Sequence, residues 1–219
     1  MYISNRTMRH VALIRRSGYL LFFWLTLSLA QAGTTTILVV GDSLSAGYGF
    51  RQEEAWPALL QKRLNSTPLT KHEQSYRVVN ASISGETTAG GRNRLPKLLN
   101  QHQPTIVIFE LGANDGLRGL QLAAMKHNLL EMLTQAKNKG ARTLLVGMRL
   151  PPNYGAYAVE FQKTFADIAT RAGTPLVPFL LENLDQAPEH FQPDGLHPTR
   201  EAQHILLSNI WPTLKRILP

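Results

Sequence analysis

The chain has 219 residues, of which 23 are Lys or Arg and 15 are Asp or Glu, so its formal net charge is +8. Residues 1–32 contain four arginines and no acidic residue, so half of that excess lies there. The remainder has no dense Lys/Arg tract, which argues against nucleic-acid binding and leaves a weak attraction to anionic membrane surfaces. The absence of cysteine excludes a thiol nucleophile, a zinc–thiolate site and disulfide bonds.

The first 32 residues have the features of an export signal. A basic region ends at Arg15-Arg16, an apolar stretch covers residues 19–29, and Ala30-Gln31-Ala32 places small residues at the two cleavage-recognition positions. An uncleaved membrane anchor is the alternative, but the apolar stretch is short for spanning a bilayer. We therefore predict a signal peptide at 1–32 that is cleaved after Ala32, a single domain at 33–219, and a periplasmic or secreted protein.

Short apolar runs recur along the rest of the chain and predict five strands. The run at 105–111 is almost continuously apolar, as expected for a parallel strand buried on both faces. The last run is short and bounded by prolines, which favours a short strand at a sheet edge. The predicted strands cover residues 36–40, 76–82, 105–111, 143–148 and 175–179.

Helical patterns alternate with these strands. The last of them places its apolar residues on one face and has Thr199 as a candidate N-cap. The predicted helices cover residues 54–64, 88–100, 120–138, 156–172 and 200–217. Such alternation predicts an α/β protein, here a doubly wound three-layer α/β/α sandwich with a five-stranded parallel sheet.

Ser43 follows the first predicted strand, inside the sequence Gly-Asp-Ser-Leu at 41–44. Open α/β sheets place their sites at this edge. Taken alone, Ser43 could equally be a turn serine that caps the next helix. As a nucleophile it would need a neighbouring base.

Near the other end of the chain, Asp194 and His197 stand in the sequence Asp-Gly-Leu-His-Pro. Histidine can accept and return a proton near neutral pH, and a carboxylate three residues away can orient its ring. His204 is the nearest rival and is interpreted as structural. Ser43, Asp194 and His197 are therefore the candidate triad of a serine hydrolase.

Two further residues follow predicted strands and could stabilise an oxyanion. Gly85 follows the second strand and Asn114 the third, so both are expected at the same sheet edge as the Ser43 N–H group. Individually, each is also typical of an ordinary turn or cap. Asp42 and Asp115 are interpreted as turn or supporting residues. No His/Asp/Glu cluster has metal-ligand spacing, so we expect no metal and no cofactor.

These residues belong to segments with recognisable motifs. The segments are 41–48 (GDSLSAGY), 80–87 (NASISGET), 110–119 (ELGANDGLRG), 149–155 (RLPPNYG) and 194–198 (DGLHP). Four of these segments resemble the blocks of the SGNH (GDSL-type) hydrolases, and the chain is most similar to their secreted bacterial thioesterase and lysophospholipase group. Segment 149–155 lies outside the general SGNH blocks and resembles that group alone. The resemblance covers essentially all of 33–219. It implies the flavodoxin-like SGNH hydrolase fold and assigns Ser43, Gly85, Asn114 and His197 to the four family positions, with Asp194 completing the triad.

The resemblance also implies how an acyl chain would be held. Residues 116–121 would form a mobile loop over the chain, with two glycines as a hinge. Leu117, Leu120, Leu150 and Tyr154 would contact the chain, although each could equally be an ordinary core or surface residue. One departure is Ala113, where many members carry glycine, and it narrows the space beside Asn114.

The function implied by the resemblance is a periplasmic serine acyl-hydrolase. It would cleave carboxylic esters and thioesters, as an arylesterase, acyl thioesterase or lysophospholipase does, through an acyl-serine intermediate and as a monomer. Two alternatives remain. A carbohydrate or peptidoglycan O-acetylesterase would prefer acetyl groups, and a non-catalytic envelope binding module would leave Ser43 unreactive toward a fluorophosphonate.

Overall fold

The computed structural model of the chain describes residues 33–66, 75–184 and 187–219. The predicted signal peptide and its cleavage site lie outside these residues. Within the described ranges, no helix is long and apolar enough to cross a membrane.

The fold is built on a five-stranded parallel sheet with the strand order β2-β1-β3-β4-β5. Its strands are β1 (Thr35–Gly41), β2 (Tyr76–Asn80), β3 (Ile106–Glu110), β4 (Arg142–Val146) and β5 (Leu176–Val177). Every residue of β1 and β3 is buried, because helices cover the sheet on both faces. The predicted fold class is confirmed.

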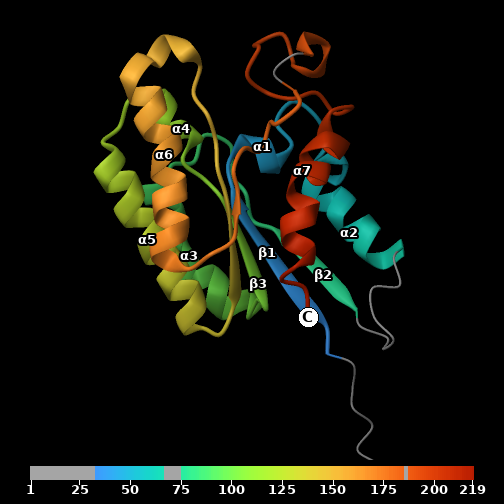
Figure 1. Cartoon of the computed structure of the whole chain (residues 1–219). Coiled ribbons are helices and arrows are strands. Elements are labelled where there is room, and N and C mark those ends of the chain that lie inside the picture. The colour runs from blue at the N-terminus through green and yellow to red at the C-terminus, as the bar shows by residue number, and fades with distance from the viewer. Residues whose placement is uncertain (1–32, 67–74, 185–186) are drawn as a thin grey trace, which may run out of the picture. The chain divides into compact units, whose positions relative to one another are not determined.

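The helices form the two outer layers of the sandwich. The longer ones are α2 (Trp56–Ser66), α3 (Thr88–His102), α5 (Leu122–Asn138), α6 (Gly155–Ala172) and α7 (Gln203–Lys215). Helix α5 packs against both α3 and α6 on one face of the sheet, and α2 packs against α7 on the other (Figure 1). The short elements are α1 (Ser43–Ala46), α4 (Ala113–Leu117), η1 (Gln52–Glu54), η2 (Pro152–Tyr154) and η3 (Pro188–His190).

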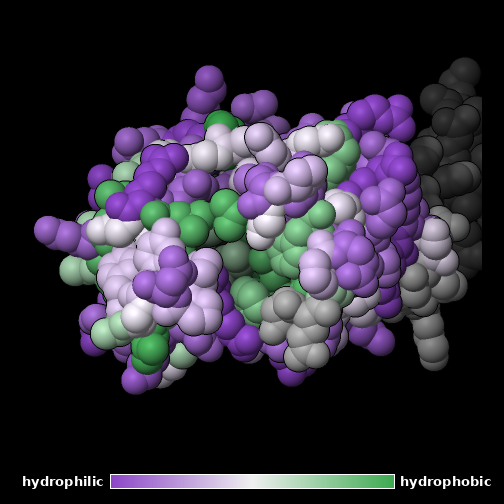
Figure 2. Space-filling model, turned by 90° about the horizontal axis from the view of Figure 1, so that it is seen from above, coloured by the Kyte–Doolittle hydropathy of each residue, from purple (hydrophilic) through white to green (hydrophobic). Residues whose placement is uncertain are grey.

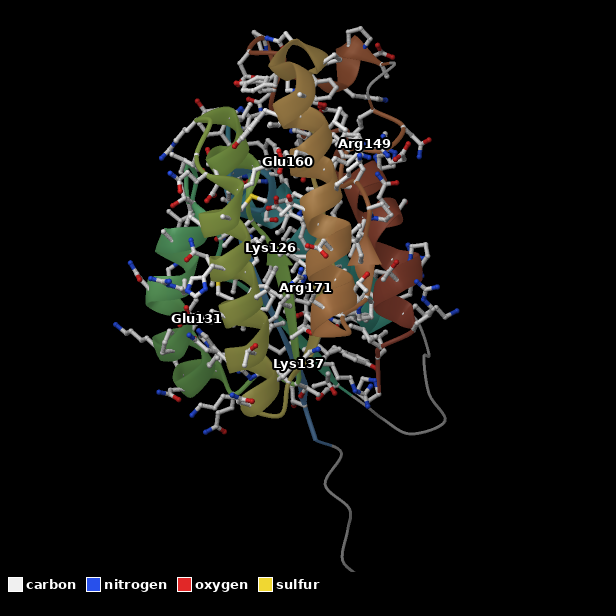
Figure 3. The ribbon with its side chains drawn as sticks, turned by 60° about the vertical axis from the view of Figure 1, so that its left-hand side comes forward. Lys126, Glu131, Lys137, Arg149, Glu160 and Arg171 are labelled. Atoms are coloured by element: carbon white, nitrogen blue, oxygen red, sulfur yellow. The ribbon has the colours of Figure 1, made fainter. Side chains whose placement is uncertain are left out.

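The outer face of α5 and α6 carries charges of both signs. Figure 3 shows Lys126 and Lys137 on α5 and Glu160 and Arg171 on α6 along this face. Asp167 forms ion pairs with both Lys126 and Arg171. Charge on this face is therefore neutralised locally and forms no basic stripe.

Several predicted boundaries were wrong, and local contacts explain two of them. Strand β2 ends at Asn80 and not at 82, because the Asn80 side chain accepts a hydrogen bond from the Ser82 N–H (3.2 Å) and turns the chain. Helix α7 begins at Gln203, with Ala202 as its N-cap residue, so Thr199 is not the cap. The Thr199 carbonyl instead accepts the Ala202 N–H (3.2 Å) in a preceding turn.

Candidate active site

The candidate nucleophile lies on a tight turn between β1 and α1. Ser43 is the first residue of α1, and Asp42 caps that helix by accepting the Leu44 N–H at 3.0 Å. Only glycine fits at position 41. A Cβ atom there would lie 2.6 Å from Glu110 Oε2 and 2.8 Å from Ser45 Oγ. The turn therefore holds Ser43 at the carboxyl edge of the sheet.

The three candidate triad residues form a continuous hydrogen-bonded chain. His197 Nε2 lies 2.9 Å from Ser43 Oγ, and His197 Nδ1 lies 2.7 Å from Asp194 Oδ2. The Asp194 carboxylate can only accept a hydrogen bond, so His197 Nδ1 carries the proton and donates it. His197 Nε2 is then free to accept a hydrogen bond from the Ser43 hydroxyl. The Tyr48 ring lies against the His197 ring, with centroids 4.3 Å apart, and restricts its rotation.

Asp194 is held by the backbone of its own turn. Its Oδ1 accepts the N–H groups of His197 (3.0 Å) and Leu196 (2.9 Å). These two bonds, the first above all, lower the pKa of Asp194 from 3.8 to about 2, and the His197 ring adds to the effect. Because Gly195 has a φ of 66°, the turn needs a residue that tolerates the left-handed region. The carboxylate is thus ionised and correctly aimed throughout the neutral range.

Of the predicted oxyanion residues, Asn114 lies in α4 and Gly85 lies in the turn between β2 and α3. Asn114 Nδ2 donates to the Glu86 carbonyl (3.0 Å) and to Asp42 Oδ2 (3.3 Å), and Asn114 lines the same cavity as Ser43. Gly85 is exposed, with a φ of 79°, and its carbonyl accepts a hydrogen bond from Arg118 (2.9 Å). Gly85 lies outside the described lining of the cavity, one residue before the carbonyl that holds Asn114.

An apolar cavity of about 530 Å³ opens at the triad. Figure 2 looks onto this edge of the molecule and shows a hydrophobic hollow there. Its apolar lining consists of Leu44, Ala113, Leu117, Met148, Leu150, Pro151, Pro152, Phe179, Leu181, Phe191 and Leu196. Such a cavity can hold a hydrocarbon chain beside the hydroxyl group of Ser43.

Two of the four predicted acyl contacts line this cavity and two do not. Leu117 and Leu150 belong to the lining. Leu120 is 41% exposed, because it lies in the turn beyond α4. The Tyr154 hydroxyl is occupied in a hydrogen bond to the Leu117 carbonyl (3.0 Å), outside the lining.

The segment predicted to be a loop at 116–121 begins inside a helix. Gly116 and Leu117 are the last residues of α4. A Cβ atom on Gly116 would lie 2.6 Å from the Phe161 ring, so this glycine serves close packing and not a hinge. Only the part after Leu117 lies outside the helix, and there Gly119 has a φ of 62° with open space around it.

The sequence prediction missed the wall of the cavity that follows β4 and β5. Met148 lies two residues past the end of β4, and Phe179 and Leu181 follow β5. The available signal was their position, since each comes just after a strand and therefore at the same edge as Ser43.

Asp115, another acidic residue at this edge, has a structural role. Asp115 is buried and accepts hydrogen bonds from Thr88 N (2.9 Å) and Thr88 Oγ1 (2.6 Å), which joins α4 to the start of α3. In the part of the chain that the structure describes, no cluster of three His, Asp or Glu side chains could hold a metal ion.

Comparisons with known proteins agree with this geometry. The model of the GDSL-like Lipase/Acylhydrolase family matches residues 39–205. Esterase TesA of Pseudomonas aeruginosa is 48% identical over 89% of this chain and 94% of its own length. Thioesterase 1/protease 1/lysophospholipase L1 of Escherichia coli is 43% identical over 84% of this chain and 85% of its own.

Solved structures of similar proteins have the same fold. A crystal structure of TesA superimposes with a TM-score of 0.79 and 49% identity, covering 84% of this chain and 100% of that one. The psychrotrophic esterase EstA from Pseudoalteromonas, inhibited by monoethylphosphonate, gives a TM-score of 0.77 at 38% identity and covers 83% of this chain and 97% of its own.

Proposed function

The chain belongs to the GDSL-like lipase/acylhydrolase family, and we propose that it hydrolyses carboxylic esters and thioesters of acyl chains through an acyl-serine intermediate. The observation that carries the proposal is the Ser43–His197–Asp194 hydrogen-bonded chain, which opens directly into an apolar cavity. The triad supplies a nucleophile with its base, and the cavity supplies a place for the acyl chain.

In the proposed mechanism, Ser43 Oγ attacks the substrate carbonyl carbon while its proton passes to His197 Nε2. Asp194 stabilises the imidazolium that forms. The negative charge on the carbonyl oxygen is stabilised by the N–H groups of Ser43 and Gly85 and by the Asn114 amide. His197 then gives its proton to the departing alcohol or thiol, and the acyl-enzyme remains. The steps require no cofactor.

The second half of the cycle repeats this chemistry with water. His197 takes a proton from a water molecule, which attacks the acyl-serine carbonyl, and the same proton returns to Ser43 Oγ as the fatty acid leaves. One ester bond is cleaved and one water molecule is consumed.

The proposed substrates follow from the cavity and from the predicted location. Most of the cavity wall is aliphatic or aromatic, which suits a medium or long acyl chain better than an acetyl group. Relatives named thioesterase and lysophospholipase favour acyl thioesters and lysophospholipids. For a protein exported after removal of residues 1–32, lysophospholipids and other acyl esters are the natural choice, because acyl-CoA is cytosolic.

The test is hydrolysis of p-nitrophenyl esters from acetyl to palmitoyl by residues 33–219, with Ser43→Ala measured beside it. We expect activity to peak at medium or long chains and to vanish in the variant. A sharp preference for acetyl would favour an O-acetylesterase instead. Failure of Ser43 to react with a fluorophosphonate would favour a non-catalytic binding module, and equal rates in both proteins would exclude Ser43 as the nucleophile.

A further inference from the structure

Two carboxyl side chains that the proposed mechanism does not use are buried beside the nucleophile. Asp42 precedes Ser43, Glu110 ends β3, and both are fully inaccessible to solvent. Glu110 is paired in register with Gly41, so it lies directly against the nucleophile turn. No ion pair joins either carboxyl group to a cation within the described ranges. Two adjacent buried carboxylates repel each other, so at most one of the two is ionised at a time.

Glu110 is the member of the pair that keeps a proton. Its Oε2 accepts the Asp42 N–H (3.2 Å) and the Ser45 hydroxyl (2.6 Å), while its buried Oε1 has no partner among the described residues. Trp56 Nε1 donates to Ser45 Oγ (3.1 Å), which directs the Ser45 hydrogen toward Glu110. Burial raises the pKa of Glu110 well above its ordinary value, and the neighbouring charge of Asp42 adds to this. The neutral acid therefore holds the turn by accepting at Oε2.

Asp42 faces donors only, which suits an ionised carboxylate. Its Oδ1 accepts the Leu44 N–H (3.0 Å) and its Oδ2 accepts from Asn114 Nδ2 (3.3 Å). The other acceptor for Asn114 Nδ2 is the Glu86 carbonyl (3.0 Å). An amide group has one donor end and one acceptor end, so two acceptors on the same side fix which way it points. If Asp42 Oδ2 were protonated, its O–H group would face the N–H group of Asn114, and two donors would oppose each other.

We propose that Asp42 is a positioning residue whose ionised carboxylate, together with the Glu86 carbonyl, keeps the nitrogen of Asn114 turned toward the oxyanion. This inference rests on the proposed hydrolase function. The contact from Asn114 to Asp42 is long, so its hydrogen remains available to a stronger acceptor, such as the oxyanion that forms beside Ser43.

The surroundings of Asp42 place its ionisation in the neutral range. Burial raises the pKa of Asp42 to about 7, and the charges of Asp115 and Glu86 raise it further, against the opposing bonds from Leu44 and Asn114. Around it, Glu86 is paired with Arg94, and Glu110 and Asp115 are buried. As pH falls through about 7, Asp42 takes up a proton and releases Asn114.

Activity should therefore depend on two deprotonated groups on the acid side. His197 must be neutral to act as the base, and Asp42 must be ionised to hold Asn114. Just below both ionisations, log(kcat) should fall with a slope approaching two per pH unit in the wild type.

The decisive variant is Asp42→Asn, studied in residues 33–219 with a p-nitrophenyl ester. The new amide can still cap α1 through its oxygen, but its nitrogen then faces the Asn114 nitrogen, which displaces or flips that amide. We expect kcat to fall by about 10²-fold, the lower end of the loss of one oxyanion donor, with KM little changed. We also expect the acid slope of this variant to be one throughout. Asp167→Asn, the same chemical change on the outer face of α6, is the control and should keep both the kcat and the slope of the wild type.

Glu110→Gln separates the two acids. Glutamine reproduces a neutral carboxyl group, with its oxygen accepting the Asp42 and Ser45 donors, so the slope of two should persist. A slope of one in this variant would overturn the assignment of Asp42 as the second group, and so would wild-type kcat in Asp42→Asn.

A measurement that does not use activity covers the case in which Asp42→Asn fails to fold. The side-chain amide resonance of Asn114 in the wild type should shift with pH, with a midpoint near 7. A resonance that does not shift overturns the inference while leaving the hydrolase proposal intact. Absence of any hydrolysis that depends on Ser43 would instead remove the hydrolase proposal and this inference with it.

Discussion

Asp194 has a low pKa although it lies near the surface. Its side chain is 38% exposed, and the backbone N–H groups of His197 and Leu196 are the main cause of a pKa of about 2. Since this folded-state value lies below the ordinary 3.8, ionised Asp194 stabilises the fold above 3.8, and that contribution is lost as pH falls toward 2. Solvent screening at this exposed site keeps the contribution small. At neutral pH, the Asp194 carboxylate is therefore ionised.

Asp194→Asn should lower kcat by about 10²–10⁴-fold with KM little changed. The asparagine oxygen can still accept the two backbone N–H groups, but the amide nitrogen then faces His197 Nδ1. That arrangement favours the tautomer with a proton on Nε2, which cannot accept from Ser43. Steady-state kinetics with a p-nitrophenyl ester measure the loss, and circular dichroism checks the fold. A kcat within threefold of the wild type would show that Asp194 does not orient His197.

The polar residues that meet at the triad could be predicted because the cues are local. Ser43 follows an apolar strand directly, and Asp194 and His197 are separated by one turn. The role of Glu110 could not be predicted in this way. A glutamate at the end of an apolar run is typical of a strand end that meets solvent, and its burial depends on packing against Ser45 and Trp56 from other parts of the chain.

At the scale of elements, α4 is fixed tightly against α6. A Cβ atom on Gly116 would lie 2.6 Å from Phe161 Cε2 and 2.9 Å from Leu150 Cδ2. Gly116→Ala should therefore lower the free energy of unfolding by about 1–3 kcal/mol, although the same change in an open helix usually stabilises. Urea denaturation measures the difference.

A double variant tests the cause of this destabilisation. Phe161→Leu makes room for the methyl group that Gly116→Ala adds. The double variant should therefore lose less free energy of unfolding than the sum of the losses in the two single variants. Strict additivity would mean that the contact with Phe161 is not responsible.

The cavity wall offers a test of where the acyl chain lies. Leu117→Trp should leave hydrolysis of p-nitrophenyl acetate nearly unchanged and lower kcat/KM for the palmitate. If the ring displaces two methylene groups from the cavity, the cost is about 1.6 kcal/mol, or roughly 15-fold in kcat/KM. Leu120→Trp is the matched control, because Leu120 is exposed and lies outside the lining. Equal effects of the two variants would place the chain elsewhere.

Element boundaries were predictable where a strand is buried on both faces and less so at the sheet margins. The runs at 36–40 and 105–111 lie within one residue of β1 and β3, because continuous burial demands continuous apolar sequence. The run at 143–148 extends past β4, because the apolar side chain of Met148 lines the cavity and does not belong to the sheet. β5 forms only two residues between Pro175 and Pro178, which lack the N–H groups that extend a ladder.

At the scale of the whole molecule, the predicted cleavage site falls just ahead of the folded domain. Strand β1 begins at Thr35 and is hydrogen-bonded on both sides, to β2 and to β3. Cleavage after Ala32 would leave only Gly33 and Thr34 before it. The mature chain would thus keep every residue of the sheet.

We predict that the exported protein begins at Gly33 and that residues 33–219 made directly have its melting temperature and kcat. N-terminal sequencing of the protein recovered from the periplasm tests the first part. Ala32→Arg should block processing, because a small residue is required at that position, whereas the neighbouring change Gln31→Arg should not. Recovery of a chain that still begins at Met1 would favour the uncleaved anchor.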